Sequence, residues 1–188
     1  MIYTEEKTLD GFVKQVSDQH YPMTSTVIAA SAAQAAALGE ACLQISLDNQ
    51  IDNLDWQDVA QRIEEMAGIK SALLDLCNQT LTVSNIDSNG REAVLDECKV
   101  FAELGRLSAS ATLILQKFRP LVFKDIAPDL EINIHLLVAT AHSALHLLEN
   151  YIANSTDAQL VAACKSAIAE IDTLLQQLDL SSLKGVVS

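Results

Sequence analysis

The segment from residue 131 to residue 149 holds the densest set of side chains that could do acid–base or metal chemistry. Glu131, His135, His142, His146 and Glu149 recur at helical spacing, and at 100° per residue they fall within about 60° of one another. Most other positions of the segment are apolar, which predicts a largely buried helix with one narrow polar stripe. Three interpretations stay open for this stripe: it faces water, it lines a cleft or subunit interface that holds a polar ligand, or it binds a metal.

The metal interpretation depends on two of these histidines. His142 and His146 are four positions apart and could share an ion, with His135 or Glu149 as a third ligand. The pattern differs from His-Glu-x-x-His, because no general base lies between the two histidines. The carboxylate pairs of helical metal proteins are absent as well. We therefore expect no metal and no resident cofactor, and His142 and His146 remain weak metal candidates.

A second candidate site precedes the alanine-rich part of the chain. Thr24, Ser25 and Thr26 follow Pro22 and lead directly into a predicted helix, whose first N–H groups and hydroxyls could bind an anion. The alternative is ordinary helix capping by Thr24 or Ser25. The sequence contains no glycine-rich phosphate loop and no Gly-x-Ser-x-Gly nucleophile motif.

The hydrophobic periodicity predicts an all-α protein, an antiparallel bundle of about six helices. Small residues on nearly every face of the alanine-rich segment predict a central helix with others around it. We expect one domain over residues 1–180 and a loose tail over residues 181–188. The predicted helices cover residues 4–19, 24–47, 56–81 with Asp55 as its cap, 91–118, 128–153, and 158–178 with its cap in residues 154–157.

Composition excludes several classes of function. The net charge of −13 and the pI near 4.5 argue against nucleic acid or an anionic membrane as partner, because both need a basic patch. Residues 27–42 are too short and too weakly apolar for a membrane-spanning helix. The N-terminus lacks the pattern of a signal peptide. The four cysteines are scattered through apolar helical stretches, which predicts buried reduced thiols and a cytoplasmic protein.

Three stretches resemble the cyclodeaminase/cyclohydrolase family, which includes the helical domain of formiminotransferase-cyclodeaminase. Residues 8–16 are similar to the family's opening helix. Residues 21–41 are similar to its Pro-Thr-Pro-Gly-Gly-Gly-Ser loop and the alanine-rich helix that follows. Residues 127–155 are similar to its later long helix, and Asn150 and Asn154 match the two asparagines of its closing Asn-Val-x-x-Asn.

The resemblance implies a homodimer that acts on a one-carbon adduct of folate, with hydrolysis of methenyl-tetrahydrofolate or loss of ammonia from the formimino form as the reaction. It places Glu131 and His135 as proton-transfer residues. Thr24, Ser25 and Thr26 would contact the ligand, with Asn150 and Asn154 nearby as further ligand-binding residues.

Two departures from the family pattern bear on activity. Side chains occupy the three positions of the family's glycines, and their Cβ atoms would obstruct a close ligand. Counted back from Asn150, the family's Ser-Asp pair falls on Glu131 and Ile132, and an isoleucine cannot transfer a proton. The function expected on this basis is a folate one-carbon protein with reduced activity. The alternative is a helical binding or scaffold protein that keeps the fold and has lost the active site.

Overall fold

The computed structural model describes residues 9–18, 23–49, 56–83 and 91–178, and every regular element in these ranges is helical. The prediction of an all-α fold is therefore confirmed. The elements are α1 (Leu9–Asp18), α2 (Thr24–Asn49), α3 (Trp56–Val83), α4 (Arg91–Phe118), the short 3-10 turns η1 (Arg119–Leu121) and η2 (Lys124–Ile126), α5 (Ala127–Asn154) and α6 (Ala158–Gln176).

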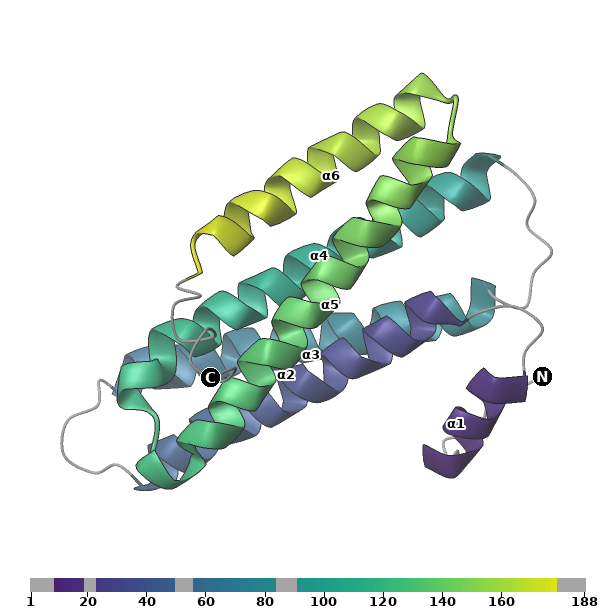
Figure 1. Ribbon diagram of the computed structural model, residues 1–188. Coiled ribbons are helices and arrows are strands. Elements are labelled where there is room, and N and C mark those ends of the chain that lie inside the picture. The colour runs from purple at the N-terminus through teal and green to yellow at the C-terminus, as the bar shows by residue number, and fades with distance from the viewer. Residues whose placement is uncertain (1–8, 19–22, 50–55, 84–90, 179–188) are drawn as a thin grey trace, which may run out of the picture.

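Four long helices form the body of the bundle, with neighbours in the chain antiparallel to each other (Figure 1). Helix α2 pairs with α3 and is crossed by α5. Helix α4 pairs with α5, and α6 packs against both. Helix α1 lies to one side and, within the described ranges, packs closely against none of the other helices.

Small residues bring α2 close to its neighbours. Ala29, Ala32 and Ala36 are completely buried, so the backbone of α2 approaches the facing helices without large side chains between them. At Gly39 an added Cβ would lie 2.9 Å from Leu115 Cδ1 of α4. The prediction of a central alanine-rich helix holds for the inner faces of α2. Its outer face is not covered as the sequence suggested, because that face carries exposed Leu38.

A second cluster of buried side chains joins α4, α5 and α6. At Gly105 of α4, an added Cβ would lie 2.5 Å from Ile171 Cδ1 of α6 and 3.2 Å from the Ala144 Cβ of α5. Cys98 of α4 and Cys164 of α6 are both buried in this cluster, with their sulfurs 3.4 Å apart. These close approaches fix α6 on the bundle.

The helix bounds follow the predictions closely. Helix α4 has the predicted bounds, and α6 begins as expected, since the Asp157 carboxylate caps it by accepting from Gln159 N at 2.9 Å. Helix α2 differs in its cap: Val27 N donates to the Met23 carbonyl, so Thr24 and Ser25 lie inside the first turn. The predictions for residues 4–8, Asp55 and the tail 181–188 fall outside the described residues.

Residues 27–42 were expected to be too short and too weakly apolar to span a membrane. Helix α2, which contains them, is long and apolar enough on length and composition alone, so the expectation is wrong on this point, and half of its most apolar window is buried inside the bundle. All four cysteines are free thiols. Cys42, Cys98 and Cys164 are buried and Cys77 is half-buried, in agreement with the prediction of reduced cysteines.

Candidate functional site

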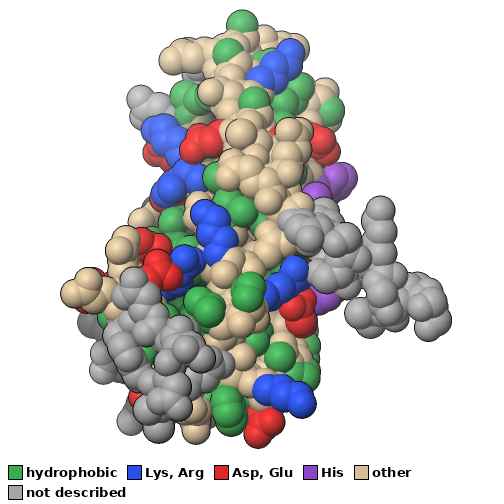
Figure 2. Space-filling model, turned by 90° about the vertical axis from the view of Figure 1, so that its left-hand side faces the viewer, with side chains coloured by type: hydrophobic (Ala, Val, Ile, Leu, Met, Phe, Trp, Pro, Cys, Tyr) green, Lys and Arg blue, Asp and Glu red, His purple; other side chains and the backbone are tan. Residues whose placement is uncertain are grey.

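The polar stripe of α5 is open to solvent in the single chain. His135 and His142 are exposed, and the His146 side chain is 83% accessible. Its Nδ1 lies 3.9 Å from Glu149 Oε2, which is too long for a hydrogen bond. Figure 2 shows histidine side chains at the surface along the right-hand edge of the view. Of the three interpretations of the stripe, the one that agrees with the single chain is that the stripe faces water.

Metal-ligating residues do not gather on this stripe. Over the described ranges, no group of three or more His, Cys, Asp or Glu side chains is placed to hold an ion. His142 and His146 lie one turn apart and are both exposed. That the protein needs no metal stays a prediction.

Glu131, the first predicted proton-transfer residue, is engaged by a cation. Arg119 in η1 donates from Nε to Glu131 Oε1 at 2.6 Å and from Nη2 to Oε2 at 2.7 Å. Two parallel hydrogen bonds of this kind hold the guanidinium and the carboxylate in one relative orientation. Glu131 therefore anchors the turn before α5. It could transfer a proton only after that pair is broken.

The predicted ligand-binding residues lie near the other end of α5. Asn154 Nδ2 donates to the Asn150 side-chain oxygen and to its backbone carbonyl, each at 2.8 Å. Both asparagines are exposed at the end of α5. Glu131 and Asn150 are nineteen positions apart on this helix, which corresponds to about 28 Å along its axis. One chain alone does not bring the two predicted sets into one site.

The start of α2, like Asn150, lies far from Glu131 and His135. Cys42 of α2 contacts Asn133 of α5, and Thr26 lies sixteen positions, or about 24 Å, before Cys42. Because α2 and α5 are antiparallel, Thr24 to Thr26 lie toward the same end of the bundle as Asn150. Thr24 is exposed, Ser25 is half-buried, and the Thr26 side chain is fully buried. Thr26 therefore faces the core and not a ligand.

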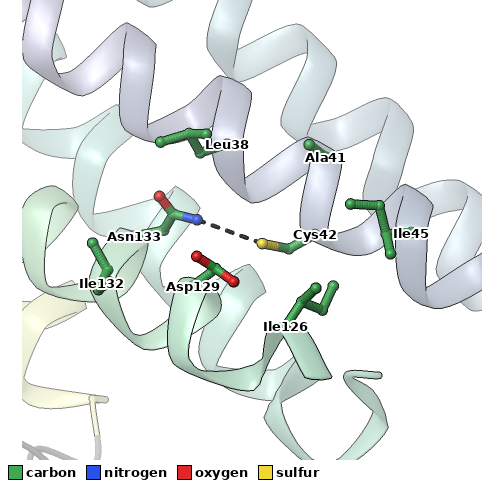
Figure 3. A pocket seen from close by; sticks show the side chains of 8 residues that line it. All are labelled: Leu38, Ala41, Cys42, Ile45, Ile126, Asp129, Ile132 and Asn133. Carbon is green, nitrogen blue, oxygen red and sulfur yellow. Dashed lines mark hydrogen bonds between the residues drawn. The ribbon is translucent and has the colours of Figure 1, made fainter. Parts of the chain in front are cut away.

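A small recess that the sequence did not predict lies where α5 crosses α2 (Figure 3). We call it the α2/α5 notch, and its volume is about 160 Å³. Its lining comes from α2 on one side and from η2 and α5 on the other. These residues are Leu38, Ala41, Cys42 and Ile45, together with Ile126, Asp129, Ile132 and Asn133.

Asn133 is the unusual residue of the notch. Its side chain is only 1% exposed, and its Nδ2 donates to Cys42 Sγ at 3.6 Å. Its Oδ1 is covered and has no hydrogen-bond partner in the described part of the chain. Exchanging the amide O and N would let the Cys42 thiol donate to Oδ1, but would leave the NH₂ group unpaired. Either way, one end of a buried amide is unsatisfied, which costs about 1–3 kcal/mol.

Two further groups define the chemistry of the notch. Burial, and to a smaller degree the charge of Asp129, raises the pKa of the Cys42 thiol, so the sulfur is protonated at neutral pH. Ile132, at the position where the family's acid falls, is 56% exposed and lines the notch. Asp129 lies one turn earlier on the same side of α5 and supplies a carboxylate there. In the sequence Asp129 and Asn133 are polar positions one helical turn apart, in a stretch where polar and apolar residues alternate.

The protein is thus an all-α antiparallel bundle with a small-residue central helix and an open seam between α2 and α5. No protein-family model matches the sequence, and no curated protein matches it. Among solved structures it is similar to formiminotetrahydrofolate cyclodeaminase from Thermotoga maritima, with a TM-score of 0.74 and 17% identity. The similarity covers 98% of this chain and 99% of that one. At this identity the likeness confirms the predicted resemblance for the fold.

Proposed function

We propose that this chain is a homodimeric protein of the cyclodeaminase fold that binds a one-carbon derivative of tetrahydrofolate and converts it far more slowly than an enzyme with intact motifs. The whole-length fold likeness supports the ligand class. Slow conversion rests on one observation: Glu131, the carboxylate next in sequence to the position of the family's acid, is held by Nε and Nη2 of Arg119.

The geometry also supports two copies. Glu131 and His135 are near one end of α5, while Asn150 and Asn154 are at the other. A site that uses both sets must therefore combine residues from two chains, because the separation within one chain is about 28 Å. The exposed stripe of α5 between them would then lie at the contact between the copies.

Loss of an acid or base group typically lowers a rate by about 10²–10⁴-fold, which sets the expected activity. The test follows loss of the methenyl absorbance with purified protein. The comparison is a variant with Ile132→Asp and glycine at residues 24, 25 and 26. An ordinary turnover on the order of 10 per second by the native chain would contradict the proposal. The chemistry would then be assigned to Glu131 and His135, and their alanine variants should be inactive.

A second candidate function is a binding or scaffold protein that uses no folate. It is favoured by the α2 start, where Thr26 is buried in the core and Thr24 and Ser25 replace the family's glycines. Thermal unfolding separates the two candidates. A folate that binds the native state must raise the melting temperature by mass action, by an amount that grows with its concentration. No shift with methenyl- or formimino-tetrahydrofolate, alongside intact dimers, would favour the scaffold.

A further inference from the structure

Cys98 of α4 and Cys164 of α6 form a pair of thiols inside the bundle, in a different buried cluster from the α2/α5 notch. Their side chains are only 4% and 1% exposed, and the Cys164 thiol donates to Cys98 Sγ at 3.4 Å. The other two cysteines have neighbours of another kind. Asn133 Nδ2 donates to Cys42 Sγ, and Cys77 Sγ lies 3.9 Å from a backbone carbonyl oxygen of α2. The fold therefore places the sulfurs of Cys98 and Cys164 in contact.

The contact between these sulfurs is part of a longer match between α4 and α6, which run in the same direction (Figure 1). Cys98 meets Cys164, and seven residues later in both helices Gly105 meets Ile171. An added Cβ at Gly105 would lie 2.5 Å from Ile171 Cδ1. Seven residues are close to two helical turns, so both contacts lie on the same face of each helix. Two contacts in the same register hold the two cysteines at the same level of the bundle.

A disulfide between this pair needs only a small movement. Bonded sulfurs are about 2.05 Å apart, so the present separation of 3.4 Å must close by about 1.4 Å. Shared between the two side chains, this is about 0.7 Å for each sulfur, which a rotation within one side-chain rotamer supplies. The bond then requires no change in the register of α6 on α4.

Helix α6 is the element whose opening would uncover both sulfurs. It lies along the edge of the bundle and packs mainly against α4 and α5 (Figure 1). Its buried side chains form one stripe: Leu160, Cys164, Ile171 and Leu175. A peripheral helix held by one stripe opens at a lower free energy than the core of a domain. Because the two cysteines meet between α4 and α6, one opening exposes both of them to a reagent.

Burial protects the pair while α6 is closed. The thiolate is the nucleophile in thiol–disulfide exchange. Burial, and next the hydrogen bond with Cys164, raises the pKa of Cys98 to about 12, from an ordinary value of 9.0. Opening of α6 removes both causes, so the thiolate forms more readily in the open state. Oxidation of the pair should therefore follow the opening of α6.

We propose that Cys98 and Cys164 form an intramolecular disulfide that locks α6 to α4, when a low-molecular-weight disulfide reaches them in the open state of α6. One cysteine thiolate attacks a sulfur of the oxidant, a mixed disulfide forms, and one small thiolate leaves. The other cysteine thiolate attacks the protein sulfur of the mixed disulfide and displaces the second small thiolate. Two electrons pass to the oxidant, and the two cysteine protons end on the two released thiols. The lock is separate from the proposed function, because it needs neither a folate nor a second copy.

The first test maps the bond. The native chain is incubated with glutathione disulfide, the remaining thiols are alkylated, and unreduced peptides are identified by mass spectrometry. We expect Cys98 linked to Cys164 in a product of monomer mass, with Cys42 and Cys77 alkylated. Urea below the unfolding transition should speed the reaction, because it favours the opening of α6. The absence of this link in both conditions, glutathione retained on the pair, or other cysteines linked in equal amount would overturn the inference.

The second test measures the lock, with the reduced native chain as reference. Hydrogen exchange of the α6 amides should slow at least tenfold in the oxidised chain, and by more than that of the α3 amides. Cys77→Ala is the matched control, because it removes a half-buried thiol outside the pair and should still lock. Cys98→Ala and Cys164→Ala should show no slowing with the oxidant. Slowing in these two variants, or unchanged α6 exchange in a chain that carries the bond, would contradict the lock.

Discussion

Helix α5 packs along two seams, and small residues allow close helix approach in both. The seam with α4 and α6 is closed, whereas the seam with α2 is open to solvent. On one side it meets α4 and α6, where Gly105 and Ala144 let the backbones approach and Leu148 is completely buried. On the other side it crosses α2, where alanines also allow close approach. There Leu38 and Ile132 stay more than half exposed, and the described residues offer no hydrogen-bond partner to Asn133 Oδ1.

The difference shows that small residues bring helices together without deciding whether a seam is closed. The α4/α5/α6 seam is closed because a third helix fills the groove, and Ile171 of α6 lies against Gly105. Among the helices that the structure describes, none covers the outer side of the α2/α5 seam. Its exposed side chains and its unpaired amide are the features expected where another molecule binds.

The largest expected contrast is between two leucines of α5. Leu148→Ala removes a completely buried side chain from the closed seam and should lower the free energy of unfolding by about 2–5 kcal/mol, through lost burial and the cavity left behind. Leu136→Ala, at an exposed position beside the open seam, should change it by no more than about 0.5 kcal/mol. Urea unfolding followed by circular dichroism, at concentrations where the chain is monomeric, measures both. Equal losses would show that the open seam is packed as tightly as the closed one.

Alkaline pH should weaken the closed seam. Burial, and next the hydrogen bond with Cys164, raises the pKa of Cys98 to about 12, from an ordinary value of 9.0. Above pH 9 the unfolded thiol loses its proton while the folded one keeps it. The unfolded state then binds fewer protons, and the free energy of unfolding falls by about 1.4 kcal/mol per pH unit up to the folded pKa.

Urea unfolding of the native chain and of Cys98→Ala, from roughly pH 8 to pH 11, checks this expectation. The variant should show a shallower fall with pH. A remaining slope is expected, because burial and the neighbouring Glu97 also raise the pKa of Tyr151 in the same cluster. Identical slopes for the two proteins would exclude Cys98 as the source.

Two glycine substitutions test the comparison through smaller changes in the free energy of unfolding. Gly105→Ala places a Cβ against Ile171 and Ala144 and should cost about 1–3 kcal/mol through overpacking. Gly68→Ala in α3 meets no atom within 4 Å, so it should stabilise the helix by about 0.5–1 kcal/mol. Thermal unfolding of both variants gives the two signs. A stabilising Gly105→Ala would mean that α6 can move away from α4 at little cost.

A further small effect is expected at Asn133 in the α2/α5 notch. Asn133→Leu replaces a half-satisfied buried amide by an apolar side chain of similar size, and should raise the stability of the monomer by about 1 kcal/mol. Chemical unfolding of the native chain and of the variant measures the difference. A large loss of monomer stability would show that the amide is satisfied within the chain.

Local sequence determined the helices. Residues 91–118 were predicted as one helix, and α4 has those bounds, because apolar spacing and the Asn-Gly turn before it act within a few residues. The cap at Asp157 is equally local. The composition alone also predicted the small-residue packing of α2, since alanine permits close contact wherever the helix is placed.

Tertiary structure decided the site. The Asn133–Cys42 contact joins residues 91 positions apart, and it exists only because α5 crosses α2 at that level. The packing of the turn before α5 likewise pairs Glu131 with Arg119. The separation of about 28 Å between Glu131 and Asn150, in contrast, follows from helix geometry alone, because both residues lie on α5. Helical periodicity fixes which side chains share a face. Which faces meet depends on how whole helices pack, and that follows from the sum of many contacts across the chain.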